Sequence, residues 1–355
     1  MKANRRTGFA RRLIAWQKRC GRRNLPWQGE RDPYRIWVSE VMLQQTQVAT
    51  VIPYYLRFLE RFPDVRTLAR SNLDGVLAAW SGLGYYSRAR SLHRAAVELV
   101  SQHGGRFPSA RQALQELPGI GRSSAAAIAV FAFGAREAIL DANAKRVLAR
   151  CYAVAGRTGE LAVESKLWTL AESLLPDKAI ECYTQALMDL GSAVCVRSRP
   201  ACERCPLALV CKARRLEQVD EFPARRARRT RPRRTTVMAI VMCARKVLLV
   251  KRPPTGIWGA MWSLPEFASA REALAQCRKR YGCDIASQRA LEPLVHGFTH
   301  FELTILPLLC RARGRAPRSE LPEVRWLDRD ATIAAPLPAP VRKLLTMLRD
   351  TRERT

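Results

Sequence analysis

The sequence predicts a chain of two domains that differ in fold class: an all-α domain with a cysteine-rich loop, and a smaller α+β domain. Three observations lead to this prediction. Helical periodicity, broken by glycine and proline, continues from about residue 8 to residue 194. Four cysteines follow within residues 195–211, and after residue 235 short aliphatic runs typical of strands alternate with helical segments. A chain of 355 residues is long enough to bury two hydrophobic cores.

The charge of the chain points to a polyanionic partner. Lysine and arginine together number 61, aspartate and glutamate 31, and the formal net charge is +30. A surplus of this size favours nucleic acid as the partner; the alternative is a basic surface that is merely solvated.

The sequence contains no pattern typical of a membrane or secreted protein. No apolar run approaches the ~18 residues that a membrane-spanning helix needs. The first stretch, MKANRRTGFARRLIAW, has basic residues but no continuous apolar core, so it does not predict a secretory signal. We therefore expect a reducing, cytoplasmic location, at the nucleoid if the chain is bacterial. There the 11 cysteines would be metal ligands or free thiols rather than disulfides.

The helical part contains a clear helix start and two glycine turns. Asp32 and Pro33 predict a capped helix that begins with proline, and YRIWVSEVMLQQTQVATVI follows with helical periodicity. G-x-G turns at residues 82–84 and 119–121 lie between helical segments, where they expose backbone N–H groups that can bind phosphate. The stretch LPGIGR before an alanine-rich helix predicts the hairpin of a helix–hairpin–helix DNA-binding module.

The cysteine-rich loop predicts a metal centre. Its spacing is C-x6-C-x2-C-x5-C, formed by Cys195, Cys202, Cys205 and Cys211. Structural zinc usually takes two short knuckles separated by a longer stretch, whereas this loop has one C-x2-C between unequal loops. Ligation by thiolates alone in one compact loop favours an iron–sulfur cluster over zinc. The other cysteines are scattered and fit small core or surface positions.

The C-terminal part is predicted to be a separate domain. The arginine-rich run ARRARRTRPRR indicates a basic linker over residues 212–235, between a domain at 1–211 and another at 236–355. TTVMAIVMC and KVLLVKR predict a hairpin of strands, and FTHFELTILPLLC and VRWLD predict a second one. Helical segments are expected between and after the strands.

Taken together, these motifs resemble one known family. SEVMLQQTQV, GLGYYSRAR, LPGIGRSSA, ILDANAKRVLAR, the cysteine loop and FTHFEL occur in this order along nearly the whole chain. They resemble the helix–hairpin–helix DNA glycosylases with an iron–sulfur loop, and within them most closely the adenine-specific, MutY-type branch with a Nudix-like domain. The resemblance implies a [4Fe–4S] cluster and double-stranded DNA with adenine opposite 8-oxoguanine or guanine. It also implies excision of that adenine in base excision repair by a monomer, with phosphate bound at Gly119 and Gly121.

Ser123 bears on the type of reaction. In the endonuclease III branch of the family, a lysine stands two residues after the second hairpin glycine, where this chain has Ser123 in Gly121-Arg122-Ser123. A lysine amine attacks the sugar carbon, forms a Schiff base and leads to strand cleavage. A serine hydroxyl cannot form an imine. The resemblance therefore implies a monofunctional glycosylase that uses water and leaves an abasic site.

Two carboxyl groups are candidates for the chemistry. Cleavage of an adenine–deoxyribose bond asks for one protonated and one ionised carboxyl. Glu40 lies in the apolar context WVSEVML, where desolvation raises the pKa of a carboxyl toward the range of a general acid. Asp141 begins the helix DANAKRVLAR, where the macrodipole and backbone N–H groups favour the charged form. Taken singly, each also fits a structural role, as a residue of an amphipathic helix and as an N-cap.

The resemblance assigns roles to these and other residues. It implies that Glu40 donates the proton, that Asp141 stabilises the sugar cation, and that Asn143 hydrogen-bonds near the reacting centre. The adenine must first leave the base stack. The resemblance makes Tyr85 a wedge beside the lesion pair, with packing in the hairpin as the alternative. Gln45 and Trp27 are assigned to the region that holds the flipped adenine, and core packing is the alternative for Trp27.

The second domain resembles the Nudix fold. KVLLVKRPPTGIWGAMWSLPEF is similar to its opening strands, but a working Nudix hydrolase needs the glutamates of R-E-x2-E-E-x-G to bind Mg²⁺. The nearest register here ends in KRYG at residues 279–282, so cations replace the carboxylates. The resemblance implies instead that this domain reads the base opposite adenine through Phe298, Thr299 and His300. Threonine stands where serine is more usual, which keeps the hydroxyl and adds a methyl group.

Two competing functions differ in kind. One is another mismatch glycosylase, specific for thymine or similar to endonuclease III; Ser123 and the Nudix-like domain count against the endonuclease III type. The other is a non-catalytic iron–sulfur regulator that binds DNA and has no need for a carboxyl pair. Excision of adenine from a duplex with 8-oxoguanine separates these possibilities.

Overall fold

The computed structural model of the chain forms two compact units. The helical unit comprises residues 1–70 and 91–228, and the mixed unit comprises residues 71–90 and 229–355. Within them the structure describes residues 2–224, 230–314, 316 and 321–350. Because the mixed unit also takes in residues 71–90, this division does not follow the domain boundaries predicted at 211 and 235, which stay predictions.

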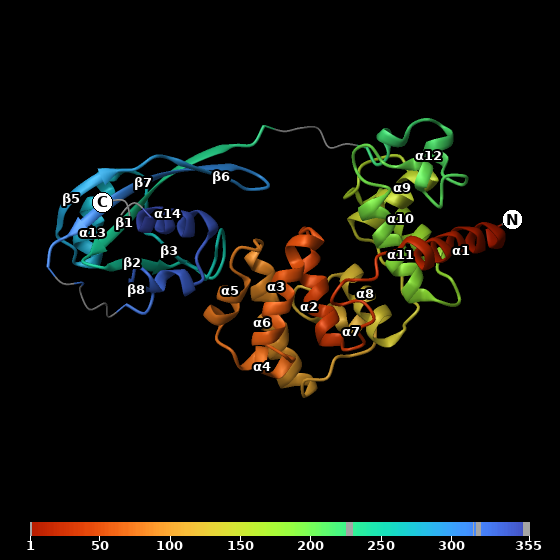
Figure 1. Cartoon of the computed structure of the whole chain (residues 1–355), viewed down its shortest axis with the longest axis horizontal. Coiled ribbons are helices and arrows are strands. Elements are labelled where there is room, and N and C mark those ends of the chain that lie inside the picture. The colour runs from red at the N-terminus through yellow and green to blue at the C-terminus, as the bar shows by residue number, and fades with distance from the viewer. Residues whose placement is uncertain (1, 225–229, 315, 317–320, 351–355) are drawn as a thin grey trace. The chain divides into compact units, whose positions relative to one another are not determined.

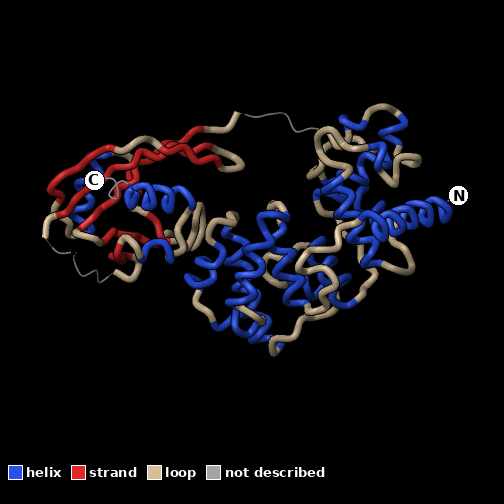
Figure 2. Tube along the Cα trace, viewed as in Figure 1, coloured by secondary structure: helices blue, strands red, loops and turns tan. Residues whose placement is uncertain are grey.

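The helical unit consists of helices joined by short turns, drawn as blue tubes in Figure 2. The α-helices are α1 (Lys2–Cys20), α2 (Pro33–Leu43), α3 (Val48–Arg61), α4 (Val65–Arg70), α6 (Tyr86–His103, which begins in the mixed unit), α7 (Arg111–Glu116), α8 (Arg122–Phe133), α9 (Ala142–Tyr152), α10 (Leu161–Ser173), α11 (Ile180–Ala193) and α12 (Lys212–Arg215). Two short 3-10 helices, η1 (Cys202–Arg204) and η2 (Val219–Glu221), accompany the cysteine loop. The all-α class predicted for this part is confirmed.

The predicted helix start at Pro33 is confirmed, but the helical stretch after it is divided. The Asp32 side chain accepts a hydrogen bond from the backbone N–H of Tyr34 at 2.9 Å, which caps α2. The helix ends at Leu43 because Gln45 adopts a left-handed φ of 57°, which no α-helix accommodates. A new helix, α3, begins at Val48. The sequence QQTQ carries no glycine or proline that would have marked this break.

The larger core of the helical unit fixes the helix that begins after Asp141. It is formed by side chains of α1, α8, α9, α10 and α11. Leu13, Leu148 and Leu167 are fully buried there. Burial of each such leucine contributes about 1.5–3 kcal/mol of stability. Helix α9 is therefore anchored in this core, where α10 and α11 pack against it.

The mixed unit is built on one sheet of eight strands, accompanied by α13 (Ala270–Tyr281) and α14 (Ala339–Asp350) (Figure 1). The strands are β1 (Arg233–Cys243), β2 (Lys246–Lys251), β3 (Trp262–Ser263), β4 (Glu266–Phe267), β5 (Ile285–Ala290), β6 (Leu294–Gly297), β7 (Glu302–Ala312) and β8 (Val324–Asp328). The path through the sheet is β3-β2-β1-β7-β5, while β4 pairs with β1, β6 with β7 and β8 with β2. The α+β class predicted for this part is confirmed.

One of the two predicted hairpins is confirmed and the other is wrong. β1 and β2 pair antiparallel through a tight turn, with Met242 opposite Val247. Both segments of the second prediction are strands, but β7 pairs with β1, β5 and β6, and β8 pairs with β2. The two edges of β7 are thus occupied by other strands. Strand propensity identified the segments, whereas the pairing depends on partners far away in the sequence.

The start of β1 lies next to the start of β7, and the two strands run parallel. The backbone N–H of Glu302 donates to the carbonyl of Pro232 at 2.9 Å, and Nε of Arg233 lies 3.3 Å from the Glu302 carboxylate. The guanidinium of Arg234 lies 4.9 Å from the ring centre of Phe301. The chain that arrives from the helical unit is therefore attached directly beside the residues that precede β7.

The segment predicted as a linker, 212–235, is only partly free of regular structure. α12 and η2 lie in its first half, and β1 begins near its end. Residues 225–229 of the arginine run lie outside the described residues.

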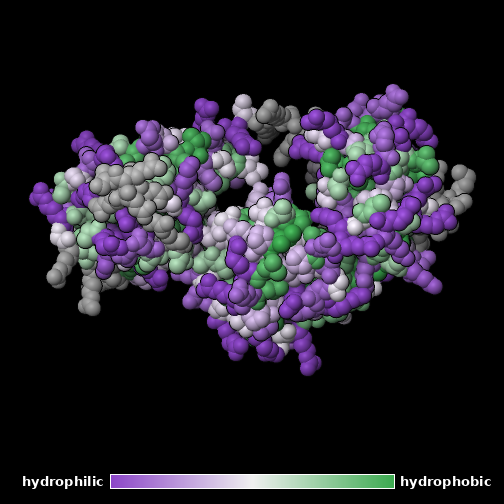
Figure 3. All heavy atoms as spheres, in the orientation of Figure 1, coloured by the Kyte–Doolittle hydropathy of each residue, from purple (hydrophilic) through white to green (hydrophobic). Residues whose placement is uncertain are grey.

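The surface of the chain is strongly hydrophilic. Figure 3 shows hydrophilic side chains over most of the visible face of both units. In the described residues, no helix is long and apolar enough to cross a membrane.

Candidate active site and cysteine pocket

Asp141 caps helix α9 and is held by two hydrogen bonds. Its carboxylate accepts from the backbone N–H of Ala144 at 2.7 Å and from Nδ2 of Asn143 at 3.2 Å. Asp141 itself has extended backbone, so its side chain turns back over the first turn of the helix. The predicted N-cap is confirmed, and Asn143 contacts the carboxylate directly.

Glu40, on α2, carries a strongly raised pKa. Burial among protein atoms is the larger cause, and repulsion from the Asp141 carboxylate is the second; together they raise the pKa of Glu40 to about 8. This bears out the expectation from the apolar context WVSEVML. This repulsion shows that Glu40 and Asp141, which are far apart in the sequence, lie near each other in the fold. We call these two residues the carboxyl pair.

The pKa of Asp141 departs from the sequence prediction. Hydrogen bonds from Ala144 and Asn143 and the charge of Arg146 all lower it, as expected for a capped helix start, but burial is the largest effect and raises the pKa of Asp141 above its ordinary value. Helix position alone therefore gave the wrong direction. We therefore place the proton of the pair on Glu40. The N–H groups of Ala144 and Asn143 donate to the Asp141 carboxylate and favour its charged form, whereas no hydrogen bond lowers the pKa of Glu40.

Ser123 lies beside the carboxyl pair and holds its backbone. Its Oγ accepts a hydrogen bond from the backbone N–H of Leu140, the residue before Asp141, at 3.0 Å. The next residue, Ser124, accepts from Nε2 of Gln44 at the end of α2 at 3.2 Å. The start of α8 thus contacts both segments that carry the carboxyl pair. Ser123, which stands where the endonuclease III branch has a lysine, therefore also makes a structural contact at the site.

The 119–121 turn joins α7 to α8, which is the predicted helix–hairpin–helix arrangement. Gly119 has φ 82°, and a Cβ there would lie 2.6 Å from the Cβ of Ser91, so only glycine fits. Gly121 caps α8, and a Cβ built there would meet no protein atom within 4 Å. The space beside Gly121 at this helix start is therefore open.

Two arginines of α9 that the sequence reading missed connect the site to the cysteine loop. Arg146 donates to Oδ1 of Asn143 at 2.8 Å, to the carbonyl of Cys195 at 2.7 Å and to the carbonyl of Gly191 at 2.6 Å. Gly191, on α11, approaches so closely that a Cβ there would lie 2.4 Å from the Cβ of Asn143. Hydrogen bonds thus lead from Asp141 through Asn143 and Arg146 to the first cysteine of the loop.

Arg150, the second of these arginines, is buried and holds the cysteine loop in place. It donates to the carbonyls of Val196 at 2.7 Å and Arg197 at 3.1 Å, and NH1 lies 3.4 Å from Sγ of Cys195. Nε donates to the carbonyls of η2 and the residue after it. The spacing of Arg146 and Arg150, four residues apart on one helix face, was the available signal in ILDANAKRVLAR.

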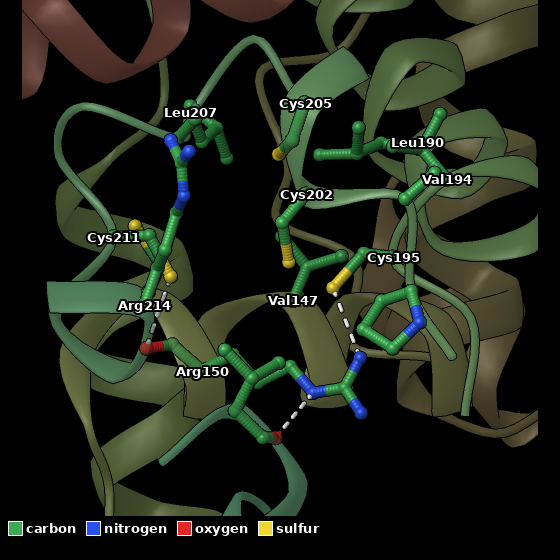
Figure 4. Close-up of a pocket in the computed structure, with 15 residues that line it drawn as sticks. Val147, Arg150, Leu190, Val194, Cys195, Cys202, Cys205, Leu207, Cys211 and Arg214 are labelled. Atoms are coloured by element: carbon green, nitrogen blue, oxygen red, sulfur yellow. Dashed lines mark hydrogen bonds between the residues drawn. The ribbon is translucent and has the colours of Figure 1, made fainter. Parts of the chain in front are cut away.

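The four predicted ligand cysteines line one pocket, which we call the cysteine pocket (Figure 4). Its other walls are mainly apolar and include Val147, Leu190 and Leu207. In Figure 4 the thiols of Cys195, Cys202 and Cys205 point toward the same space, with Arg150 beneath. Burial, followed by repulsion from the neighbouring thiols, raises the pKa of Cys205 to about 11, so thiolates here need a positive centre.

The four cysteines offer the cysteine pocket a donor set of thiols. Among the described residues, no group of three or more histidine, cysteine, aspartate or glutamate side chains is placed to hold a single metal ion. A donor set made only of thiols, spread around a small space with apolar walls, fits a multi-atom iron–sulfur centre.

A basic pocket of about 690 Å³ adjoins the first turns of α9. Its cationic lining consists of Lys145, Arg146, Arg150, Arg157 and Arg197. The positive charge of this pocket lies one helical turn from Asp141, where a phosphate backbone would be attracted.

The remaining predicted residues of the helical unit lie in two different settings. Gln45 is exposed in the turn between α2 and α3. Trp27 packs edge-on against the buried ring of Tyr55, with 5.3 Å between ring centres. Trp27 thus has a packing contact, and its place near a flipped adenine stays a prediction.

In the mixed unit, Tyr85 stands exposed in a strained turn. Its side chain is 44% exposed although it is a large aromatic, and its φ of 49° is in the left-handed region. The guanidinium of Arg88, which is itself buried, lies 5.2 Å from the Tyr85 ring and 5.5 Å from that of Trp80. The Tyr85 ring thus packs against Arg88 at the start of α6.

Phe298, Thr299 and His300 lie at the tip of the β6–β7 hairpin. The backbone N–H of Phe298 donates to the carbonyl of Phe301 at 2.9 Å, which closes a four-residue turn, the 298–301 turn. The Phe298 and Phe301 rings stack, with 4.4 Å between their centres, and leave Thr299 and His300 exposed. The hydroxyl of Tyr85 lies 3.4 Å from Oγ1 of Thr299.

Helix α13, which corresponds to the Nudix motif, is basic at the end where a hydrolase would bind its cation. Its last turn contains Arg278, Lys279 and Arg280, and it ends at Gly282 in the left-handed conformation. The three cations thus stand together in the last turn of the helix, and the expectation that the domain does not hydrolyse pyrophosphates stays a prediction.

Comparison with known proteins adds family relationships to this geometry. The sequence model of the HhH-GPD superfamily of base excision DNA repair proteins matches residues 38–173, and that of the NUDIX domain matches residues 236–347. The adenine DNA glycosylase of Buchnera aphidicola subsp. Baizongia pistaciae is 35% identical over 342 residues, which cover 96% of this chain and 97% of that protein. The human adenine DNA glycosylase is 33% identical over 402 residues, covering 95% of this chain and 73% of that protein.

A solved structure supports the fold of the helical part. A thermostable thymine-DNA glycosylase superposes with a TM-score of 0.54 at 28% identity, covering 60% of this chain and 98% of that one. The capped aspartate, the glycine hairpin and the cysteine loop all occur within a sequence that matches adenine-specific relatives from end to end. The chain therefore belongs to the adenine DNA glycosylase family, joining a helix–hairpin–helix base excision repair domain to a NUDIX domain.

Proposed function

We propose that this protein is a monofunctional glycosylase that removes adenine opposite 8-oxoguanine or guanine from double-stranded DNA and leaves an abasic site. The observation that carries the proposal is the carboxyl pair, in which Glu40 has a pKa of about 8 beside a hydrogen-bonded Asp141. A non-catalytic regulator would have no use for such a pair. The relatives named adenine DNA glycosylase supply the substrate class.

The chemistry follows from the division of protons within the carboxyl pair. Protonated Glu40 donates to the departing adenine, which leaves as a neutral base. As the N-glycosidic bond breaks, positive charge develops on the sugar, and the Asp141 carboxylate, oriented by Asn143, stabilises it. A water molecule adds to the sugar carbon and gives its proton to the Glu40 carboxylate, which restores the acid. The products are adenine and an abasic site.

Ser123 accounts for the absence of strand cleavage in this proposal. Its hydroxyl is occupied as the acceptor for the N–H of Leu140 and cannot form an imine with the sugar. The strand is therefore left intact after the base has been removed.

The cysteine pocket fits a [4Fe–4S] cluster held by Cys195, Cys202, Cys205 and Cys211. When bound, the cluster would supply the positive centre that four neighbouring thiolates require, and would fix the shape of the loop. This loop carries the exposed side chains of Arg197, Arg199 and Arg204, which would contact DNA phosphates. The open helix start at Gly121 and the basic pocket would add further phosphate contacts.

Recognition of the lesion is assigned to exposed residues of the mixed unit. Tyr85 would act as a wedge, and Thr299 and His300, at the end of the 298–301 turn, would contact the base opposite adenine. Gln45 and Trp27 would border the flipped adenine. We propose further that the protein acts as a monomer in the cytoplasm, on nucleoid DNA if the source is bacterial.

One assay tests the proposal and its competitors. Duplexes of one sequence carry adenine opposite 8-oxoguanine, guanine or thymine, or thymine opposite guanine, and each is incubated with excess enzyme, with and without borohydride. We expect alkali-dependent breaks at adenine, fastest opposite 8-oxoguanine, and little trapped protein–DNA adduct. Excision of thymine alone would support a thymine-mismatch enzyme. Binding without any excision would support a regulator, and strand breaks without alkali would refute the monofunctional mechanism.

A further inference from the structure

Residues 71–90 pack against residues 229–355 within the mixed unit, although they interrupt the helical part of the sequence. This segment contains α5 (Leu73–Trp80), the turn that presents Tyr85, and the start of α6. The contacts include specific polar interactions with the sheet and its loops. They are separated by 169 to 261 residues in the sequence, so no local pattern accounts for them.

The first contact is made by Asp74, in the first turn of α5. Its Oδ1 accepts from Nζ of Lys251 at 2.8 Å, and its Oδ2 accepts from Nε1 of Trp262 at 2.9 Å. NH1 of Arg325 lies 3.9 Å from the same carboxylate. The two cations also flank the Trp262 ring, at 5.4 and 4.5 Å from its centre. Both oxygens of Asp74 are therefore engaged by the sheet through β2, β3 and β8.

The second contact lies at the other end of the segment. NH1 of Arg90 donates to the carbonyl of Gly259 at 2.9 Å. The neighbouring residue, Trp258, has its ring 5.3 Å from that of Phe298 in the 298–301 turn. Arg90 thus holds the loop against which that turn packs. In the middle of the segment, Ser81 donates to the carbonyl of Leu337 at 3.1 Å and accepts from Arg342 at 2.8 Å.

Between these anchored positions lies a weak contact that joins Tyr85 to Thr299 of the 298–301 turn. The hydroxyls of Tyr85 and Thr299 lie 3.4 Å apart, at the outer limit of a hydrogen bond and in exposed positions. Such a contact cannot by itself fix the distance between a wedge and a hairpin tip. The charge-assisted hydrogen bonds of Asp74 are shorter and more enclosed, and are therefore stronger.

We propose that Asp74 is a positioning residue for lesion recognition: by locking segment 71–90 onto the sheet, it sets the spacing between Tyr85 and the 298–301 turn. Arg90 acts in the same way from the other end. The inference rests on the proposed function, because it concerns discrimination between 8-oxoguanine and guanine opposite adenine. Asp74 takes no part in the excision chemistry, so its loss should change the preference rather than the ability to cleave.

The test compares second-order excision rate constants on the two duplexes, measured at limiting enzyme concentration. Asp74→Asn keeps the shape and removes the charge, and Trp262→Phe removes one donor while keeping a ring. We expect each to lower the preference for 8-oxoguanine by about three- to tenfold, the effect of one ordinary hydrogen bond, with excision opposite guanine changed less than about twofold. Asp330→Asn is the matched control, since it removes an exposed ion pair with Arg245 in the same unit.

A second arm separates positioning from general destabilisation. In a Thr299→Ala background, Asp74→Asn should cause no further loss of preference, because the contact that it positions is already absent. A loss of excision on both duplexes by the same factor, or an unchanged preference in both Asp74→Asn and Trp262→Phe, would overturn the inference. If the inference fails in this way while the wild-type protein still prefers 8-oxoguanine in the same assay, the proposed function stands. Wild-type protein that excises no adenine would overturn both.

Discussion

The carboxyl pair and the 298–301 turn are two sites with opposite physical settings. Glu40 and Asp141 are set among protein atoms, and burial is the largest influence on the pKa of each. Thr299 and His300 are exposed at the end of a two-strand hairpin. Chemistry on a glycosidic bond requires a site from which water is displaced, since only there does a carboxyl hold a proton at neutral pH. Reading a base edge requires side chains that reach outward.

This difference teaches where mutations should act. If the proposed roles hold, a change at the carboxyl pair should alter the protonation state and hence the rate of excision, with little effect on DNA binding. A change at the 298–301 turn should instead alter the choice between duplexes, with little effect on the reaction itself. Single substitutions and changes of pH test this separation.

The largest effect is expected for Glu40→Gln. An amide cannot supply the proton, so single-turnover excision should fall by about 10²- to 10⁴-fold. Asp141→Asn should also lower the rate strongly, because a neutral amide cannot stabilise the sugar cation. Binding to a duplex with adenine opposite 8-oxoguanine, measured by anisotropy, should stay near the wild-type level in both. Near-normal excision by either variant would remove that residue from the mechanism.

The raised pKa of Glu40 predicts a dependence on pH. The folded state holds a proton up to about pH 8, whereas the unfolded chain loses it near the ordinary value of 4.5. The free energy of unfolding therefore falls progressively as the pH rises from 4.5 to about 8, because Glu40 loses its proton more easily in the unfolded chain. Glu40→Gln should be more stable than the wild type by on the order of a few kcal/mol at pH 8, and no more stable near pH 4. Urea unfolding at the two pH values measures the difference.

The same titration should appear in the reaction. Wild-type excision should slow as pH rises above about 8, where Glu40 loses the proton that it donates. A single-turnover rate that stays constant up to about pH 9.5 would exclude Glu40 as the acid, whatever the result of the unfolding experiment.

Cys202→Ser tests the link between the cysteine pocket and DNA binding. Loss of one ligand should reduce the iron content and the folding yield, and should weaken DNA binding. The salt slope of binding should fall in magnitude by about one unit for every phosphate that the loop no longer contacts. Iron analysis and binding over a range of salt measure these effects. Cys20→Ser is the matched control, since Cys20 is exposed outside the pocket. Purified protein with stoichiometric zinc and no iron would contradict the assignment.

His300→Ala should change the choice of duplex rather than the rate. Removing a polar interaction with a base edge costs about 1–3 kcal/mol of discrimination, so the preference for 8-oxoguanine over guanine should fall by about tenfold. His103→Ala, at the exposed end of α6, is the control. This variant is a cleaner test than removal of residues 236–355, because truncation would also strip the partners of segment 71–90. Equal weakening on both duplexes would make the domain a general clamp.

The smallest effect is expected at Ser123. Ser123→Ala removes the acceptor for the Leu140 N–H and should slow excision by about two- to tenfold, while Ser123→Thr keeps the hydroxyl and should change it less. Ser123→Lys places an amine at the same position and should increase the amount of adduct trapped by borohydride. An Ala variant as fast as the wild type would show that the hydrogen bond has no role in positioning Asp141.

Much of the fold was predictable because it depends on local patterns. The cap at Asp32, the helical periodicity of the first part and the β1–β2 hairpin are all encoded within a few residues of where they form. The apolar surroundings of Glu40 in the sequence likewise predicted its raised pKa correctly. The cysteine spacing identified four residues that do line one pocket.

The remainder depends on contacts that no local pattern contains. The pKa of Asp141 rises because helices from distant parts of the chain bury it, an effect that outweighs the local helix start. The hydrogen bonds of Asp74 join residues 177 and 188 positions apart. The pairing of β8 with β2 likewise depends on which edges other strands leave available. Propensity identifies elements, whereas burial and partner choice are properties of the assembled chain.

The attachment of β1 beside β7 has a mechanical consequence. The basic linker enters the sheet at Arg233, opposite Glu302, and the parallel ladder continues to Met242 opposite Arg311. A pull along the linker would therefore be distributed over the whole ladder instead of peeling the sheet open one bond at a time. The pull would act at Arg233, opposite Glu302, which is the residue that follows the 298–301 turn. The base of that hairpin is therefore where a load on the ladder begins.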